Sequence, residues 1–142
     1  MIKVVDLHKT FGGQAVLKGI NLDLETGKVT TIIGGSGSGK TVLLKHLNAL
    51  LLPDRGSVLV DGKDIIKLGE RELNEVRQKF GVLFQGAALL DSMTLYDNVA
   101  FPLREKTKMS EGAIRKRVEA RLAQVGLAGM GYKHPAEASG GM

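Results

Sequence analysis

One stretch of the sequence restricts the possible folds more than any other: GGSGSGKT, at residues 34–41. It fits the pattern G-x-x-x-x-G-K-[ST], and it lies between a β-branched apolar run, VTTIIG, and an amphipathic segment. Glycines allow consecutive backbone N–H groups to turn inward and form an anion-binding concavity, and the start of a helix adds unpaired donors. The pattern therefore predicts a strand, a phosphate-binding turn and a helix in direct succession.

The residue types of this turn suit a nucleoside triphosphate bound with Mg²⁺. Lys40 would place its ammonium beside the β- and γ-phosphates, and the Thr41 hydroxyl is an oxygen ligand of the kind that Mg²⁺ prefers. The alternative is a glycine-serine linker that matches by chance, and the flanking strand and helix disfavour it. The residues predicted to surround the phosphates through their backbone are Gly34, Gly35, Ser36, Gly37, Ser38 and Gly39.

Composition narrows the function classes further. A chain of 142 residues is long enough for one domain with its own core. The absence of cysteine excludes disulfides and thiolate metal sites, and the three histidines are too dispersed for a metal site. The net charge of +5 suits phosphate-bearing partners, although a solvated basic helix explains it equally well. The N-terminus does not resemble a signal peptide, and no apolar run approaches the ~20 residues that span a bilayer.

Hydrophobic periodicity predicts an α/β fold with a central sheet. Strands are expected at 2–11, 16–24, 29–34 and 80–85, and a hairpin at 56–65 that turns at Asp61-Gly62. Four helices are expected. The first carries a leucine stripe from Leu43 to Leu51 and stops at Pro53, and the second covers 70–79. The third covers 95–101, with Thr94 as its N-cap and Pro102 as its end or kink. The fourth covers 111–125, between Ser110 as N-cap and Gly126 as the stop.

Three further features of the sequence indicate a protein family only when they are considered together. Phe11 alone is most simply a core residue, and Gln85 alone is a weak signal. Combined with residues 34–41 and with Ser139-Gly140-Gly141-Met142, in this order and spacing, they resemble the ATPase subunits of ABC transporters over essentially the whole chain. The resemblance implies that Phe11 stacks on adenine, that 34–41 is Walker A, that Gln85 positions Mg²⁺ and water, and that the signature motif begins at Ser139, Gly140 and Gly141.

The resemblance also implies an architecture and partners. The fold would be a P-loop NTPase of the ABC type: a mixed central sheet, an antiparallel N-terminal β part and a helical subdomain. Residues 1–142 would be the N-terminal portion of the domain, with the core over about 1–85 and the Q-loop and helical subdomain over about 86–142. ATP would be bound between two such subunits, and membrane permease subunits would dock on about 86–104. Ala138 departs from the leucine usual before Ser-Gly-Gly.

Two stretches, GVLFQGAALLDSMTLYDNVAFPLRE and EASGGM, further resemble the Mla/Mce-type phospholipid transport ATPases, also called the toluene-tolerance type. This resemblance implies a cytoplasmic subunit on the inner face of the membrane that energises lipid transport. A soluble ABC protein of DNA repair or translation is the alternative. The basic helix AIRKRVEAR has no interleaved aromatic residues, so we favour a solvated helix face and expect no nucleic-acid partner.

The catalytic glutamate of the family follows the signature motif, in the Walker B strand. We therefore expect a chain truncated before Walker B that binds nucleotide and hydrolyses it little by itself. Two aspartates, Asp61 and Asp91, follow apolar residues as in Walker B, but neither precedes a glutamate. Asp61 is better explained as a hairpin-turn residue.

Overall fold

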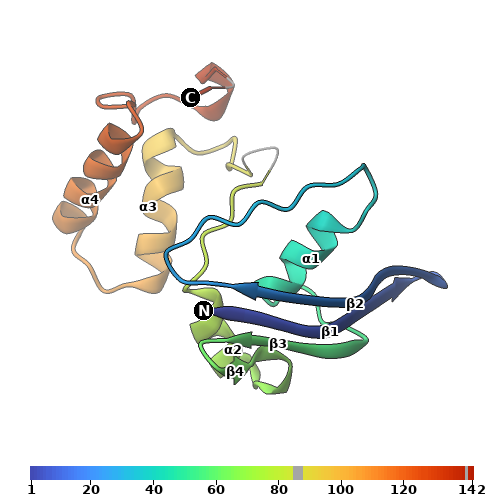
Figure 1. The fold of residues 1–142 in the computed structure, drawn as a ribbon. Coiled ribbons are helices and arrows are strands. Elements are labelled where there is room, and N and C mark those ends of the chain that lie inside the picture. Colours follow the sequence, from blue (N-terminus) through green and yellow to red (C-terminus); the bar gives the residue numbers. More distant parts are fainter. Residues whose placement is uncertain (85–87, 140) are drawn as a thin grey trace. The chain divides into compact units, whose positions relative to one another are not determined.

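A computed structural model describes residues 1–84, 88–139 and 141–142, so Gln85 and Gly140 lie outside the described residues. The chain forms two compact units, Met1–Val82 and Leu83–Met142, and each is considered by itself (Figure 1). The functional division at about residue 85 remains a prediction. None of the described helices is long and apolar enough to cross a membrane.

The first unit is built on a four-stranded antiparallel sheet of order β2-β1-β3-β4. Its elements are β1 (Ile2–Phe11), β2 (Gln14–Leu24), α1 (Lys40–Leu47), β3 (Arg55–Val60), β4 (Lys63–Asp64), a 3-10 turn (Ile65–Lys67) and α2 (Glu70–Arg77). The antiparallel N-terminal part and the hairpin are thereby confirmed. Asp61 and Gly62 have φ values of 49° and 81°, as the tight turn between two twisted strands requires.

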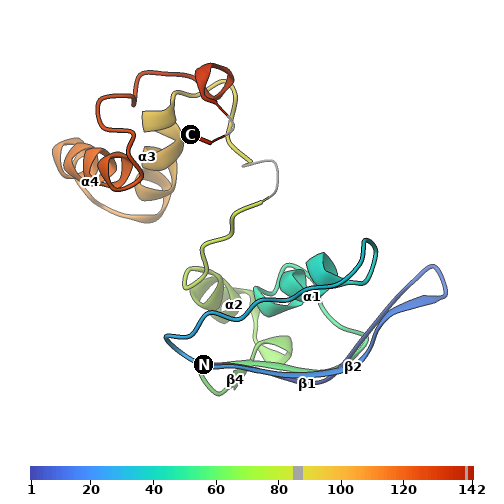
Figure 2. The same cartoon turned by 45° about the horizontal axis from the view of Figure 1, so that its top comes forward.

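Both helices of this unit lie on the same side of the sheet (Figure 2). The apolar side chains of that face and of the two helices form one core, with Leu7 and Val58 fully buried in the sheet. Alternation along β1 places Ile2 and Val4 in this core, and a bulge after Val5 moves the next buried position to Leu7. The helices contribute Leu43 and Leu47 from α1, and Leu73 and Val76 from α2.

Two predicted strands are not formed among the described residues. The run 29–34 is extended but joins no sheet, and Val29 and Ile33 are 96% and 87% exposed. The run 80–84 likewise pairs with nothing, and Leu83 is 89% exposed. A strand exists only through its ladder of hydrogen bonds, and the sheet described here ends at β2 and β4 without taking up either run. The described sheet is consequently antiparallel throughout rather than mixed.

The first helix is also shorter than the leucine stripe predicted. It ends at Leu47, because Ala49 adopts a left-handed conformation with φ of 57°. The N–H groups of Leu50 and Leu51 both donate to the Lys45 carbonyl, at 2.9 and 3.0 Å, and close the turn. Leu50 is therefore half exposed instead of extending the buried stripe.

The second unit packs α3 (Leu95–Lys106) against α4 (Glu111–Gln124), followed by a 3-10 turn (Pro135–Glu137). Its core is small and aliphatic, and it consists of Ala100, Ile114, Val118 and Leu122. The predicted boundaries of α4 are confirmed: Ser110 Oγ accepts from the Ala113 N–H, and Gly126 has φ of 77°.

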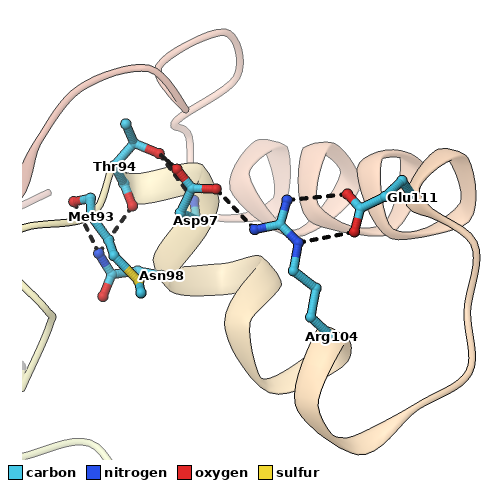
Figure 3. A network of polar contacts seen from close by, with 6 residues as sticks. All are labelled: Met93, Thr94, Asp97, Asn98, Arg104 and Glu111. Carbon is cyan, nitrogen blue, oxygen red and sulfur yellow. Dashed lines mark hydrogen bonds and ion pairs between the residues drawn. The ribbon is translucent and has the colours of Figure 1, made fainter.

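The third helix does not end at Pro102 but continues to Lys106. A network of polar contacts holds both of its ends (Figure 3). Thr94 Oγ1 accepts from the Asp97 N–H as the N-cap, and Asp97 accepts from Arg104 at 3.0 Å across the proline. Arg104 also forms two hydrogen bonds with Glu111 of α4, at 3.0 and 3.1 Å. These contacts offset the backbone hydrogen bond that the proline removes.

Candidate phosphate-binding site

The turn before α1 depends on glycine at two positions. Gly37 and Gly39 have φ values of 76° and 91°, in the left-handed region that disfavours other residues. Gly39 also lies against β2: a Cβ added there would stand 3.0 Å from Leu17 Cδ2 and 3.1 Å from Val16 Cγ1. Gly39 is therefore required both by its backbone conformation and by the close approach of the turn to the sheet.

The turn presents backbone donors that the protein itself does not use. Among the described residues, Ser38 is the one member of 34–39 whose N–H finds a backbone acceptor, the Gly35 carbonyl at 3.3 Å. The helix begins at Lys40 with no side-chain cap and no acidic residue in its first turn. Its first N–H groups and the positive end of its dipole are thus available to an anion.

Lys40 lies over this turn. Its Nζ donates to the carbonyl oxygens of Gly34 and Gly35, at 2.8 and 2.7 Å, and lies 3.5 Å from Ser38 Oγ. The ammonium therefore stands beside the unused N–H groups, where it would neutralise the charge of a bound phosphate. Thr41 follows on the first turn of α1, with its side chain exposed.

A pocket of about 260 Å³ opens at this point. Its lining consists of Val16 from β2 and of the six residues Gly37, Ser38, Gly39, Lys40, Thr41 and Val42. Sequence reasoning missed Val16, because it joins the site only through the approach of β2 to Gly39. Nothing in the sequence predicts the contact between Val16 and Gly39.

The second unit has a larger pocket, of about 410 Å³, with a different chemistry. Its lining includes Tyr96, Leu122 and Tyr132 together with two residues of opposite charge, Arg115 and Glu119. Arg115 would attract a polyphosphate, but the Glu119 carboxylate in the same lining opposes it. The smaller pocket is the better phosphate site, because glycine-turn amides and an ammonium surround it.

The other predicted site residues, among them Gly34, Gly35 and Ser36 of the same turn, are not members of this lining. Phe11 ends β1 and is 45% exposed, with its ring 5.5 Å from Lys9 Nζ. Ser139 and Gly141 belong to the second unit, where the Met142 N–H donates to the Ser139 carbonyl at 2.9 Å. Gln85 and Gly140 fall outside the described residues.

The residues of this turn could bind Mg²⁺ only together with a bound phosphate. The described part of the chain holds no group of three or more His, Asp or Glu side chains that could bind a metal. A hydroxyl such as that of Thr41, combined with phosphate oxygens and water, satisfies the octahedral preference of Mg²⁺ without such a cluster.

Comparison with known proteins identifies the family and the fold of the chain. The profile of the family described as ABC transporter matches residues 17–142. The fold resembles the dimeric ATP-binding cassette MJ0796 in a post-hydrolysis state bound to ADP and Pi, with a TM-score of 0.88 and 32% identity over 99% of this chain and 64% of that one. The chain belongs to the ABC transporter family, and its fold is that of an ABC-type ATPase cassette.

Curated relatives extend the likeness to transport systems. The "Probable ribonucleotide transport ATP-binding protein mkl" of Mycobacterium leprae (strain TN) is 52% identical over 99% of this chain and 41% of its own length. The "Intermembrane phospholipid transport system ATP-binding protein MlaF" is 45% identical in Haemophilus influenzae and 38% identical in Escherichia coli K12, over 54% and 53% of those proteins. The chain thus spans about half the length of the curated relatives it matches.

Proposed function

We propose that this protein is the ATP-binding subunit of an ABC transport system. The observation that carries the proposal is the turn 34–39, with its unused amides beside the Lys40 ammonium at the start of α1. These groups would hold the β- and γ-phosphates of ATP, and the Thr41 hydroxyl would hold Mg²⁺. The family match and the solved cassette with ADP and Pi support this assignment.

Other residues would complete the site around the same nucleotide. Phe11 would stack on the adenine, and Gln85 would position Mg²⁺ and water. Ser139, Gly140 and Gly141 of a second subunit would contact the γ-phosphate, so that ATP joins two subunits and its hydrolysis separates them. The dimeric state of the similar cassettes supports such a pairing.

We assign no general base within the 142 residues. Asp61 occupies the hairpin turn and accepts from Lys79 at 2.7 Å. The hydrogen bond from Lys79 is the main reason why the pKa of Asp61 is lowered to about 2. A carboxylate held in this way is a poor proton acceptor. We propose that the residues present bind nucleotide and hydrolyse it little by themselves, because neither Asp61 nor Asp91 is followed by a glutamate that could act as the base.

The proposed cargo is phospholipid, moved by membrane permease subunits that dock on about 86–104. The relatives named MlaF support the phospholipid, whereas the name of mkl favours ribonucleotides. Leu89, Leu90 and Phe101 support the docking surface, because each is more than 40% exposed on the described part of that segment. A subunit bound there would lie on the inner face of the cytoplasmic membrane.

Reconstitution of the purified transport complex in liposomes tests this function. We expect ATP to drive redistribution of a fluorescent phospholipid between donor and acceptor membranes, and a non-hydrolysable ATP analogue to give none. Radiolabelled ribonucleotides should stay where they were placed. Movement of ribonucleotides without phospholipid would contradict the cargo. If no membrane subunit co-purifies and the protein binds RNA or DNA in a salt-sensitive manner, the soluble alternative holds instead.

A further inference from the structure

Lys9 is held in place unusually firmly for a lysine on a sheet. Its Nζ donates to Asp54 Oδ1 at 2.7 Å and to the Leu52 carbonyl at 2.9 Å, and its side chain is 15% exposed. Lys9 and Phe11 are two residues apart on β1, so their side chains leave the same face of the strand. The ammonium lies over the Phe11 ring, 5.5 Å from its centroid, within the range of a cation–π contact.

Asp54 fixes the other side of this arrangement. Its Oδ2 accepts from the Thr10 N–H at 2.7 Å, and its own N–H donates to the His8 carbonyl at 3.0 Å. The hydrogen bond from Lys9, and next the one from Thr10, lower the pKa of Asp54, so the carboxylate is charged at neutral pH. The segment that follows α1 is thereby tied to β1 immediately before Phe11.

Phe11 ends the strand that pairs with β2, and β2 contributes Val16 to the phosphate pocket. In the β1–β2 hairpin, Phe11 pairs with Gln14, and Thr10 pairs with Ala15, the residue before Val16 in the pocket lining. Gln14, the partner of Phe11, and Val16 are two residues apart on β2, which corresponds to about 7 Å along an extended strand. The ring is half exposed and so is open to a planar ligand, and we expect the base of a nucleotide whose phosphates occupy the pocket to reach it.

We propose that Lys9, held by Asp54, is a positioning residue for the nucleotide base, because it fixes the Phe11 ring on which the base stacks. This inference rests on the proposed function. Attraction between the ammonium and the ring holds the aromatic plane before the ligand arrives, so less side-chain freedom is lost on binding. The effect concerns the base alone, since neither Lys9 nor Asp54 lines the phosphate pocket.

A comparison of two ligands tests this inference on the purified protein. Calorimetry would measure the Kd of Mg²⁺-ATP and of Mg²⁺ with inorganic triphosphate, which has no base. We expect Lys9→Met to weaken ATP by about three- to tenfold and to leave triphosphate unchanged. Lys9→Arg should restore most of the ATP affinity, because it keeps a cation over the ring. Lys3→Met is the matched control, since Lys3 lies on the same strand in a looser ion pair of 3.9 Å.

Double substitution separates a positioning role from a structural one. In a Phe11→Ala background, Lys9→Met should cost no further ATP affinity, because the ring through which it acts is gone. If the Lys9→Met protein does not fold, Asp54→Asn should weaken ATP binding to the same extent and leave triphosphate binding unchanged. Equal weakening of both ligands, an unchanged ATP affinity, or full additivity with Phe11→Ala would overturn the inference and leave the phosphate site standing. A wild-type protein that binds neither ligand would overturn the proposed function as well.

Discussion

Lys40→Ala is expected to weaken Mg²⁺-ATP binding by about ten- to a hundredfold, the range for loss of a charged hydrogen-bonding group. The substitution removes the ammonium beside the unused amides of the turn, and also its hydrogen bonds to the carbonyls of Gly34 and Gly35. Affinity for inorganic triphosphate should fall to the same extent, because the phosphates are what Lys40 contacts. Isothermal titration calorimetry with both ligands measures the effect.

Lys45→Ala provides the control for this substitution. Lys45 lies on the same helix, is exposed, and belongs to its last turn instead of its first. Lys45→Ala removes one positive charge at the opposite end of the helix from the turn, so ATP affinity should change less than about twofold. Equal losses in the two variants would mean that net charge, and not the Lys40 contact, governs binding.

Gly56→Ala is expected to destabilise the first unit by about 3 kcal/mol, because backbone strain and a steric overlap add together. Gly56 has φ of +97°, and a Cβ there would stand 2.2 Å from the Asp6 carbonyl oxygen and 2.6 Å from the Val5 oxygen. Both obstacles are backbone atoms of β1, where a bulge at Asp6 shifts the register between Val5 and His8. Relief would require separation of β1 from β3.

Gly62→Ala isolates the strain from the overlap. Gly62 also has a positive φ, of 81°, but a Cβ there would meet nothing within 4 Å. Its cost should be about 1 kcal/mol, the price of the left-handed conformation alone. Urea unfolding of both variants measures the difference. If Gly56→Ala is no more destabilising than Gly62→Ala, β3 does not approach the Asp6 bulge as closely as described here.

Features with a local signal could be predicted from the sequence. The Thr94 and Ser110 caps, the Gly126 stop and the Asp61-Gly62 turn each depend on a few neighbouring residues, and the structure confirms them. The glycine turn at 34–41 also depends on contiguous residues, and its binding of phosphate stays a prediction. Such elements can be predicted because neighbouring residues alone determine them.

Features that depend on distant residues could not be predicted in this way. An apolar β-branched run such as 29–34 indicates a buried strand, yet it does not name the strand that pairs with it. The bulge at Asp6 has no sequence signal, and its close neighbour Gly56 lies on another strand. Lys9 and Asp54 are 45 positions apart, so their contact appears only after folding.

Amide chemical shifts of the wild-type protein, followed by NMR while Mg²⁺-ATP is added, show which residues the triphosphate contacts. We expect the largest changes on the amides of 35–42, and we expect inorganic triphosphate to reproduce them there. Largest changes around the second pocket, at Tyr96 and Tyr132, with residues 35–42 unaffected, would contradict it.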